Sequence, residues 1–405
     1  MLKRIIKKIA PSFLLDFYHY LLALTGAFLY GFPSWRLIII GVTGTSGKST
    51  IVELAAKILE EAGFKVASLS SIKFKIGEKE RENKLKMTMP GRLKIQKFLS
   101  QAVKTGCKYA VLEVTSEGIK QFRHKFIKFD VAVLTNLSPE HIEAHAGFEK
   151  YREAKLKLFK NTKKIHIINL DDENAEYFWK IPAEKKIGYR LNEAAKLLPK
   201  NLNLLGEFNL YNALAAVHIG LSQGISLDIC KRALEKIRGI PGRMEIVVKE
   251  PFIVVVDYAH TPEALKKVYE TLKGAKLICV LGACGGGRDK WKRPVLGELA
   301  AKYCDETIIT NEDPYDENPW EIIEQVAGGA FEEIRLNPRK SASIYKILDR
   351  REAIRKSLGL AKPGDIIIIT GKGCEPSICL AKGKKISWDD GQVVREEFRK
   401  LKVQN

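Results

Sequence analysis

A glycine-rich loop that ends in a lysine follows a run of apolar residues near the start of the chain. The segment reads LIIIGVTGTSGKST over residues 37–50. An apolar strand fixes such a loop, its glycines let backbone N–H groups turn inward, and the next helix adds the positive end of its dipole. Lys48 could then reach the outer phosphates of a nucleotide, and the Ser49 hydroxyl could ligate Mg²⁺. Five residues separate Gly41 from Gly47, one more than in the usual phosphate loop.

Composition limits the class of protein. A chain of 405 residues is long for one hydrophobic core, so two or three domains are expected. Its 45% hydrophobic and 29% charged content is typical of a globular protein. The seven cysteines form no CxxC pair, which argues for a reducing cytosol and against both a disulfide framework and a zinc ribbon.

The formal net charge of +20 is compatible with nucleic acid, a membrane surface or an anionic substrate as partner. Lysines are scattered along the whole sequence, and no basic stretch is interleaved with aromatic residues. We therefore predict a generally basic, solvated surface and no nucleic-acid partner.

The first 36 residues differ from the rest. Four basic residues come first, namely Lys3, Arg4, Lys7 and Lys8. A mostly apolar, aromatic-rich stretch follows over 13–32, and Asp16 near its start and Pro33 after its end disfavour a membrane-spanning helix. No small-residue cleavage site follows, as a signal peptide would need. Two interpretations stay open: a helix that lies in a membrane interface, and a helix packed on the neighbouring domain.

Beyond residue 36 the pattern alternates between strands and helices. Buried parallel strands are predicted at 37–42, 109–114, 130–135 and 165–169, and then at 252–257, 276–282, 306–311 and 365–370. Helices are expected near 262–272, 293–302 and 350–358. This order predicts an α/β fold with mainly parallel sheets covered on both faces. We expect a short N-terminal helical segment (1–36), a P-loop-type central domain (37–244) and a smaller Rossmann-like domain (245–405).

Polar clusters stand where three of these elements begin or end. They read EVTSE at 113–117, TNLSPEH at 135–141 and YREAK at 151–155. The carboxyl ends of parallel strands meet at one edge of a sheet, which is where α/β sheets place ligands. Because Mg²⁺ prefers oxygen ligands and keeps phosphates and waters in its shell, carboxylates beside a phosphate loop predict a magnesium site.

The motifs together resemble the Mur ligase family, the ATP-dependent amide ligases of peptidoglycan precursor synthesis. The branch that adds the third peptide residue, a diamino acid, to UDP-N-acetylmuramoyl-L-Ala-D-Glu is the most similar. The matching pieces occur in family order: GVTGTSGKST (41–50), EVTSEGIKQFR (113–123), TNLSPEHIEAH (135–145), YREAKLKLF (151–159), LLGEFNLYNALAA (204–216), PGRMEIV (241–247), VVDYAHTPEAL (255–265), GACGGGRDKWKRP (282–294), DPYDENP (313–319) and GKGCE (371–375).

The resemblance implies roles for particular residues. The catalytic positions would be Lys48, Glu113, His141, Lys155 and Arg288. ATP would be bound by Gly44, Thr45, Ser46, Gly47, Lys48, Ser49, Thr50, Asn209, Asn212, Asp257, His260 and Arg288, with Lys292 as a further candidate. Two Mg²⁺ ions would be held by Ser49, Glu113, His141 and a carbamylated Lys155. The muramoyl peptide and amino acid would meet Thr88, Thr115, Gln121, Arg123, Asp313, Tyr315, Gly371 and Glu375.

The resemblance also implies the reaction. The D-glutamyl carboxylate would attack the γ-phosphate of ATP to give an acyl phosphate, which an amine delivered by the C-terminal domain would then capture. Domain closure would exclude water from that intermediate. The enzyme is expected to be a monomer in the cytoplasm, with peripheral contact to the inner membrane surface through residues 1–36 as an open question.

Several positions depart from the family pattern. Only 36 residues precede the phosphate loop, too few for the usual uridine-binding domain, so a lipid-linked muramoyl peptide is an alternative acceptor. Diaminopimelate enzymes carry a DNPR motif whose arginine meets the distal carboxylate, whereas this chain has EDPY at 312–315. The loss of that arginine, together with the acidic residues around it, favours L-lysine over meso-diaminopimelate. Met89 replaces a threonine of a TTP loop, and Cys374 replaces a histidine.

Two other kinds of function compete with this interpretation. One is another amide ligase of the superfamily, such as a folylpolyglutamate or cyanophycin synthetase. The other is a non-catalytic, membrane-associated nucleotide-binding protein descended from a ligase. The presence of all five catalytic positions favours an enzyme, and phosphate release that needs both a muramoyl peptide and an amine would discriminate between them.

Overall fold

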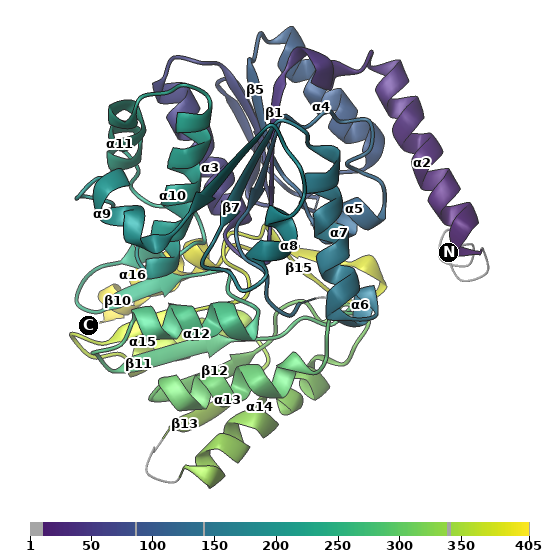
Figure 1. The fold of residues 1–405 in the computed structure, drawn as a ribbon. Coiled ribbons are helices and arrows are strands. Elements are labelled where there is room, and N and C mark those ends of the chain that lie inside the picture. The colour runs from purple at the N-terminus through teal and green to yellow at the C-terminus, as the bar shows by residue number, and fades with distance from the viewer. Residues whose placement is uncertain (1–10, 86, 141, 338–341, 405) are drawn as a thin grey trace. The chain divides into compact units, whose positions relative to one another are not determined.

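The computed structural model describes residues 11–85, 87–140, 142–337 and 342–404. They form two compact units (Figure 1). Unit 1 takes its described residues from Met1–Pro139, Phe148–Leu202 and Asn209–Ile237, and unit 2 takes them from Glu140–Gly147, Asn203–Phe208 and Arg238–Asn405.

Unit 1 is built on an eight-stranded sheet with the order β4-β3-β2-β5-β1-β6-β7-β8. Its strands are β1 (Ile38–Thr43), β2 (Val66–Leu69), β3 (Lys73–Ile76), β4 (Lys79–Glu82), β5 (Tyr109–Glu113), β6 (Val131–Leu134), β7 (Ile165–Asn169) and β8 (Lys185–Tyr189). All pair in parallel except β3 and β4, which are antiparallel to their neighbours. The four strands predicted for this unit are confirmed.

Helices cover both faces of this sheet. They are α2 (Ser12–Leu29), α3 (Lys48–Glu61), α4 (Arg92–Lys104), α5 (Ser116–Lys120), α7 (Phe148–Asn161), α8 (Ala175–Trp179), α9 (Ala194–Leu197), α10 (Glu207–Ser222) and α11 (Leu227–Glu235), with 3₁₀ turns η1 (Pro33–Arg36) and η2 (Leu191–Glu193). In Figure 1, α3, α10 and α11 lie on one side of β1 and β7, and α4, α5 and α7 lie on the other.

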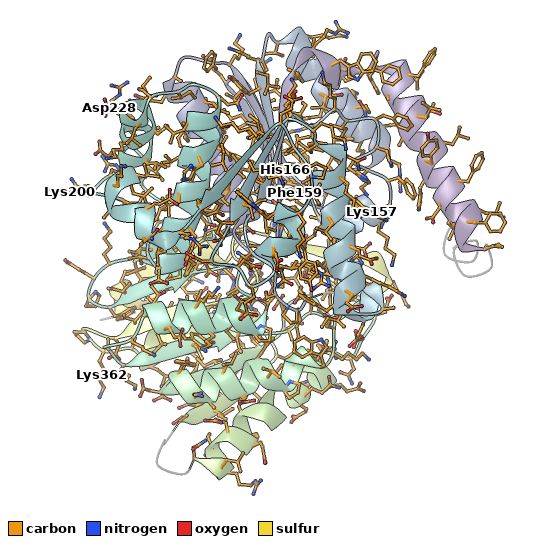
Figure 2. All side chains as sticks on the ribbon, viewed as in Figure 1. Lys157, Phe159, His166, Lys200, Asp228 and Lys362 are labelled. Carbon is orange, nitrogen blue, oxygen red and sulfur yellow. The ribbon has the colours of Figure 1, made fainter. Side chains whose placement is uncertain are left out.

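The central strands are apolar on both faces because helices cover both. Every residue of β5 and β6 is buried. One face packs on α4, α7 and α8, where Phe159 of α7 and His166 of β7 lie with ring centroids 4.9 Å apart (Figure 2). A strand buried on both sides is a continuous apolar run, which is why the sequence indicates these strands clearly.

Unit 2 has a six-stranded sheet with the order β13-β12-β11-β14-β10-β9 and a separate hairpin, β15-β16. Its strands are β9 (Glu245–Val248), β10 (Ile253–Val256), β11 (Leu277–Leu281), β12 (Glu306–Thr310), β13 (Ser343–Ile347), β14 (Ile366–Ile369), β15 (Ser377–Cys379) and β16 (Lys385–Ser387). Only β9 is antiparallel within the six-stranded sheet. The four strands predicted here are also confirmed.

Two hydrophobic cores hold the helices of unit 2 against its sheet. Its helices are α6 (Ile142–His145), α12 (Pro262–Thr271), α13 (Lys292–Tyr303), α14 (Pro319–Leu336), α15 (Arg350–Leu360) and α16 (Asp390–Gln404), with the 3₁₀ turn η3 (Ala381–Gly383). α12, α13 and α14 cover one face, and α15 and α16 the other. The predicted α/β class, with mainly parallel sheets in both units, is confirmed.

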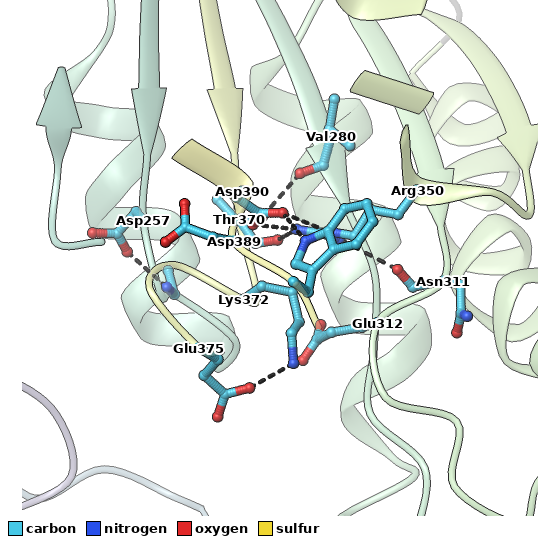
Figure 3. A network of polar contacts seen from close by, with 12 residues as sticks. Asp257, Val280, Asn311, Glu312, Arg350, Thr370, Lys372, Glu375, Asp389 and Asp390 are labelled. Carbon is cyan, nitrogen blue, oxygen red and sulfur yellow. Dashed lines mark hydrogen bonds and ion pairs between the residues drawn. The ribbon is translucent and has the colours of Figure 1, made fainter. Parts of the chain in front are cut away.

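A buried arginine joins the carboxyl ends of two strands in unit 2 (Figure 3). Arg350 forms a two-pronged ion pair with Asp390, at 2.9 Å from Nε and 2.7 Å from Nη2, and donates to the carbonyls of Thr370 and Asn311. Both charged side chains are almost fully buried. Because the geometry satisfies both charges, the pair fixes the loops that follow β12 and β14.

No helix within the described part of the chain combines the length and the apolar content that crossing a membrane requires.

Candidate active site

The predicted phosphate loop connects β1 to α3 in unit 1, and its glycines have no room for a side chain. Gly47 is the N-cap of α3 with a φ of 82°, and a Cβ there would lie 2.2 Å from Oδ1 of Asn212. Gly44 has a φ of 150°, and a Cβ there would lie 1.8 Å from Oγ1 of Thr135. Positive φ and close neighbours together explain why glycine stands at both positions.

The residues that follow β6 hold this loop in place. The backbone N–H of Ser46 donates to Oδ1 of Asn136 at 2.9 Å, and the Ser46 carbonyl accepts from Thr135 Oγ1 at 2.7 Å and from Asn136 Nδ2 at 3.2 Å. The Thr45 N–H donates to the carbonyl of Asn136 at 2.8 Å. We assigned neither Thr135 nor Asn136 a role from the sequence, although their place at a strand end was a usable signal.

Two lysines direct their ammonium groups at the loop. Lys48 donates to the carbonyls of Gly44, at 3.1 Å, and Thr45, at 2.6 Å. Lys155 of α7 is buried and donates to the same Gly44 carbonyl at 2.7 Å, and its Nζ lies 4.5 Å from the ring centroid of Tyr151. The structure thus brings together two predicted catalytic residues that are far apart in sequence. Two cations at a loop rich in N–H groups suit a polyphosphate.

An oxygen-rich cluster lies at the start of α3. Ser49 Oγ donates to Glu113 Oε2 at 2.8 Å, and the same carboxylate oxygen accepts from the Ser71 N–H at 2.9 Å. Lys48 Nζ is 4.0 Å from Glu113 Oε1. A hydroxyl and a carboxylate beside a phosphate loop are hard oxygen donors, so these residues fit Mg²⁺ that also takes phosphate oxygens. Ser71 was missed because it stands in a loop without a motif.

The described residues do not complete the predicted metal set. His141 lies outside them. Elsewhere in the ranges that the structure describes, no three His, Cys, Asp or Glu side chains are gathered in a way that could hold a metal ion. Of the four predicted metal ligands, Ser49, Glu113 and Lys155 are among the described residues, and all three lie at the start of α3 or at the loop before it.

The two asparagines assigned to the nucleotide base lie on α10, next to the loop. Asn212 Nδ2 donates to Asn209 Oδ1 at 3.0 Å, and both side chains are buried. The close approach of Asn212 to Gly47 connects this pair directly to the start of α3. The structure therefore brings Asn209 and Asn212 to the phosphate loop.

Unit 1 contains four residues predicted to contact the muramoyl peptide, and three of them, Thr115, Gln121 and Arg123, make hydrogen bonds at or next to α5. Arg123 donates to the Met89 carbonyl and, at 2.8 Å, to Gln121 Oε1, and Gln121 Nε2 donates to Glu117 at 3.1 Å. Thr115 Oγ1 caps α5 by accepting from the Gly118 N–H. The fourth candidate, Thr88, adjoins this group in sequence through Met89.

The replacement of a threonine by Met89 has a physical consequence. The Met89 side chain is fully buried in the unit 1 core, and its Sδ is so close to Gly118 that a Cβ there would lie 2.3 Å away. The side chain thus packs against α5, and only its backbone carbonyl offers a polar contact, which Arg123 takes.

In unit 2, Asp257 and His260 follow β10. Asp257 accepts from the N–H groups of Met244, at 2.7 Å, and Ala259, at 2.6 Å, and its burial raises the pKa of its carboxyl. Burial, with Lys292 nearby, lowers the pKa of His260 to about 3, and its Nδ1 lies 2.9 Å from the Tyr258 carbonyl. His260 is therefore neutral at pH 7 and can act as a hydrogen-bonding group, not as a cation.

The segment after Arg288 holds the residues on either side of position 141. Asp289 accepts from the N–H groups of Ile142 and Glu143, at 3.1 Å each, and Lys292 forms a buried ion pair with Glu140 at 3.0 Å. Lys292 therefore has a carboxylate partner within unit 2. Asp289 was not singled out from the sequence, although it belongs to the quoted GGGRDK motif.

The acidic cluster predicted around Tyr315 contains a resident cation. Lys372 is fully buried and contacts both oxygens of Asp313, at 3.0 and 2.9 Å, and Oε2 of Glu375, at 2.6 Å. Burial opposes its charge, but Glu375 and Asp313 raise the pKa of Lys372 above its usual range. Asp313 and Glu375, two of the four carboxylates that we expected to favour a substrate ammonium, are thus already paired; the other two are Asp316 and Glu317.

A different carboxylate in this cluster keeps an oxygen unpaired. Glu312 is 2% exposed, its Oε1 accepts from the Cys284 thiol at 2.8 Å, and its Oε2 has no hydrogen-bond partner among the described residues. Burial raises the pKa of Glu312. Burial also raises the pKa of the nearby Cys374 thiol to about 11, so that thiol stays protonated and unreactive at pH 7.

Comparison with known families gives two matches in sequence order. Residues 42–220 match the Mur ligase middle domain, and residues 242–373 match the Mur ligase glutamate ligase domain.

Three of the similar proteins are named as ligases or synthetases of UDP-N-acetylmuramoyl peptides. A UDP-N-acetylmuramoyl-L-alanyl-D-glutamate–2,6-diaminopimelate ligase of Syntrophomonas wolfei is 38% identical over 408 residues, covering 93% of this chain and 81% of that protein. The ligase of the same name from Aquifex aeolicus is 37% identical, covering 91% and 78%. A UDP-N-acetylmuramyl-tripeptide synthetase of Roseiflexus is 33% identical, covering 94% and 82%.

Solved structures agree with this result. A UDP-N-acetylmuramoyl-L-alanyl-D-glutamate–2,6-diaminopimelate ligase superposes with a TM-score of 0.59 at 32% identity, covering 91% of this chain and 79% of that one. A folylpolyglutamate synthase of Mycobacterium tuberculosis bound to ADP superposes with a TM-score of 0.67, but at 17% identity, covering 87% and 91%. The similarity to the folylpolyglutamate synthase concerns the fold alone.

The crowding at Gly47 generates a test of the phosphate loop. Gly47→Ala should lower the free energy of unfolding by about 1–2 kcal/mol, because alanine is strained at positive φ. It should also weaken ATP binding by about tenfold, because the loop must move away from Asn212. Calorimetric titration and thermal unfolding would measure both quantities.

The matched control is Gly359→Ala, in an open part of helix α15 where nothing lies within 4 Å of an added Cβ. It should leave ATP binding unchanged and stabilise the helix slightly. Equal ATP affinity of Gly47→Ala and the unaltered protein would contradict the tight packing of the loop.

Proposed function

We infer the reaction of this chain from its family. The chain belongs to the Mur ligase family and is a ligase that forms carbon–nitrogen bonds. We propose that it adds a diamino acid to UDP-N-acetylmuramoyl-L-Ala-D-Glu with consumption of ATP. More than a third of the aligned residues, over nearly the whole chain, are identical to those of ligases named for UDP-N-acetylmuramoyl-L-alanyl-D-glutamate. This similarity supports the proposed substrate. The observation that carries the proposal is the convergence of Lys48, Lys155, Ser49 and Glu113 on one phosphate loop.

The proposed reaction has two steps. A carboxylate oxygen of the acceptor attacks the γ-phosphorus of ATP, ADP leaves, and an acyl phosphate forms. The amine nitrogen then attacks the acyl carbon, the C–O bond to phosphate breaks, and the amine loses a proton as the amide forms. Each step is helped by holding the reactants close together and by offsetting charge on the phosphoryl group.

The residues of this chain would divide that work. Lys48 and the loop N–H groups would hold the β- and γ-phosphates, and Asn209 and Asn212 would meet the base. We propose that Thr88, Thr115, Gln121 and Arg123 contact the muramoyl peptide, with Arg123 pairing with a carboxylate. Asp257, His260 and Arg288 of unit 2 are our further proposals for nucleotide contacts.

Mur ligases use ATP and Mg²⁺. Ser49 and Glu113 have the oxygen donors that magnesium prefers, and His141 is our proposal for a second ion. When bound, the metal would offset negative charge on the phosphates.

The contribution of Lys48 can be measured by product formation. Lys48→Ala should lower the rate of amide formation by on the order of a hundredfold or more, because a cation that contacts the transferring group is lost. The assay would combine Mg-ATP, the UDP-linked dipeptide and a diamino acid, and follow product by mass spectrometry. The control is Lys57→Ala, which changes an exposed lysine of the same helix that pairs with Glu60 and should retain the rate. An unchanged rate for Lys48→Ala would contradict the proposal.

We also propose that Lys155 is carbamylated during turnover. Its burial at the loop, close to Gly44, supports this, because adding CO₂ turns a cation into an anion that can sit beside a metal instead of repelling it. The carbamate would then act as one more oxygen donor.

A carbamate at Lys155 makes activity depend on bicarbonate. Removing CO₂ from the buffers should lower the rate of the unaltered protein, and adding bicarbonate should restore it. Lys155→Ala should be inactive and should regain part of its rate with acetate, because a free carboxylate can replace the carbamate. Lys48→Ala is the control, and acetate should not raise its rate, because Lys48 is not proposed to carry a carbamate. A rate for Lys155→Arg equal to that of the unaltered protein would exclude the carbamate.

We propose L-lysine as the amino acid that is added, with meso-diaminopimelate as the alternative. Tyr315 stands where the diaminopimelate enzymes have the motif arginine, and a phenol cannot neutralise a distal carboxylate. Asp313 and Glu375 pair with Lys372, so they no longer favour a substrate ammonium. Among the carboxylates of this cluster, Glu312 supports an ammonium partner best, because one of its oxygens has no hydrogen-bond partner among the described residues. The names of the most similar ligases favour diaminopimelate, so the choice needs a direct test.

Tyr315→Arg tests which group selects the amino acid. The unaltered protein should prefer lysine in a competition between the two amino acids. The variant should shift the ratio of kcat/KM values toward diaminopimelate by about tenfold or more, since a hydrogen bond to a charged group contributes about 1.5–3 kcal/mol. Preference of the unaltered protein for diaminopimelate would rule out lysine.

We further propose that the protein is a cytoplasmic monomer with functional domains at 37–244 and 245–405.

A further inference from the structure

Helix α2 exposes an apolar face that nothing in the described chain covers. Its exposed large residues recur at helical spacing: Phe13 (67% exposed), Leu14 (48%), Phe17 (63%), Tyr18 (49%), Leu21 (48%), Phe28 (75%) and Leu29 (64%). Residues three and four apart lie on one side of a helix, so these side chains lie on one side of α2 between residues 13 and 29, and we call them the outer stripe. In Figure 2 a row of side chains on one side of this helix points away from the rest of unit 1.

The opposite side of α2 is attached to unit 1 by small residues. Ala23 and Ala27 are buried, and Gly26 is so close to α4 that a Cβ there would lie 3.3 Å from the Cα of Leu93. Tyr20 adds ring contacts with Phe126, at 5.2 Å between centroids, and Phe122, at 6.3 Å. The packed side therefore fixes α2 in an orientation that turns its largest apolar residues outward, so the packing of the helix does not explain the outer stripe.

The helix carries few charged groups. Asp16 is its only charged residue apart from titratable His19, and it stands near the N-terminal end. The hydroxyl of Thr25 donates to the carbonyl of Leu21 at 2.9 Å, so it needs no water partner. Large exposed apolar patches commonly mark interaction sites.

Cationic and aromatic residues stand close to α2 in the sequence and on the helix that packs against it. Lys94 and Lys97 are exposed on α4, the helix that packs on α2. Trp35, 70% exposed, and the exposed Arg36 stand in η1, shortly after the end of α2. The sequence before α2 contributes four more cations, Lys3, Arg4, Lys7 and Lys8. Aromatic residues beside Lys and Arg are typical of helices that lie in a membrane interface.

We propose that the outer stripe of α2 binds the surface of an anionic lipid bilayer, with the helix lying in the interface. The lipid acyl region would receive Phe13, Phe17 and Phe28, and the lysines and arginines would meet the negative headgroups. The helix has 18 residues and Pro33 follows it, which suits an interfacial position and not a span. The charge of the surrounding residues favours an anionic surface over a second copy of this basic chain, which would repel it. The proposal does not depend on the reaction that the enzyme catalyses.

The test is sedimentation of the full-length protein with vesicles. Vesicles of phosphatidylglycerol and phosphatidylcholine should bind the unaltered protein, vesicles of phosphatidylcholine alone should bind it at least about tenfold less, and added salt should weaken binding. The triple variant Phe13→Ser, Phe17→Ser, Phe28→Ser should lose vesicle binding by about tenfold or more. Its matched control, Phe331→Ser, removes an aromatic residue of similar exposure (50%) from α14 and should bind as the unaltered protein does.

Other measurements separate a lipid surface from the alternatives. The triple variant should keep the thermal midpoint and the ligation rate with soluble substrates, since its changes are exposed and outside the candidate site. Absence of vesicle binding by the unaltered protein, or equal binding by the triple variant, would overturn the proposal. It would also be overturned if light scattering showed a dimer that the triple variant converts to a monomer, because the outer stripe would then be a contact between two copies.

Discussion

The attachment of the phosphate loop to the end of β6 is the constraint on which the candidate site depends. A glycine-rich loop is flexible by itself, and only fixed N–H groups can hold phosphates without a further ordering cost. Asn136 and Thr135 bind the backbone of Ser46 on both its N–H and its carbonyl sides. This fixes the start of α3, and therefore the positions of Lys48 and Ser49, which we propose to meet phosphate and Mg²⁺. Lys155 contacts the same loop from α7, so three separate elements converge on one short segment.

The cluster after β12 and β14 in unit 2 is fixed in a different way, by buried charge. Arg350 with Asp390, and Lys372 with Asp313 and Glu375, satisfy nearly every charged atom that the two loops bury. Such networks keep their geometry because breaking one member leaves another charge unpaired. The consequence for function is that most carboxylates there serve the architecture. On our proposal that this cluster meets the incoming amine, selectivity would depend on carboxylate oxygens such as Oε2 of Glu312, which has no hydrogen-bond partner among the described residues.

The sequence predicted the loop and the strands β1, β5, β6 and β7 of unit 1, because a glycine-rich motif and long apolar runs are local signals. It missed β2, which is buried but only four residues long. Strands buried on both faces are continuous apolar runs, and GTSGKST has few structural alternatives. The hairpin β3-β4 escaped prediction because KERE at 79–82 is fully exposed and looks like a loop. The pairing of Lys372 with Asp313 could not be deduced either, since 59 residues separate them. Composition showed that 13–32 is apolar, but only packing decides which side of α2 is covered.

The reaction itself is tested most directly by following an oxygen atom. The acceptor dipeptide would carry heavy oxygen in its D-glutamyl carboxylate, and inorganic phosphate released during ligation would be collected and weighed. An acyl phosphate requires that a carboxylate oxygen leave with the phosphate, so each released phosphate should contain a heavy oxygen. Phosphate that contains only light oxygen, formed together with the amide product, would contradict activation of the carboxylate by ATP at this loop.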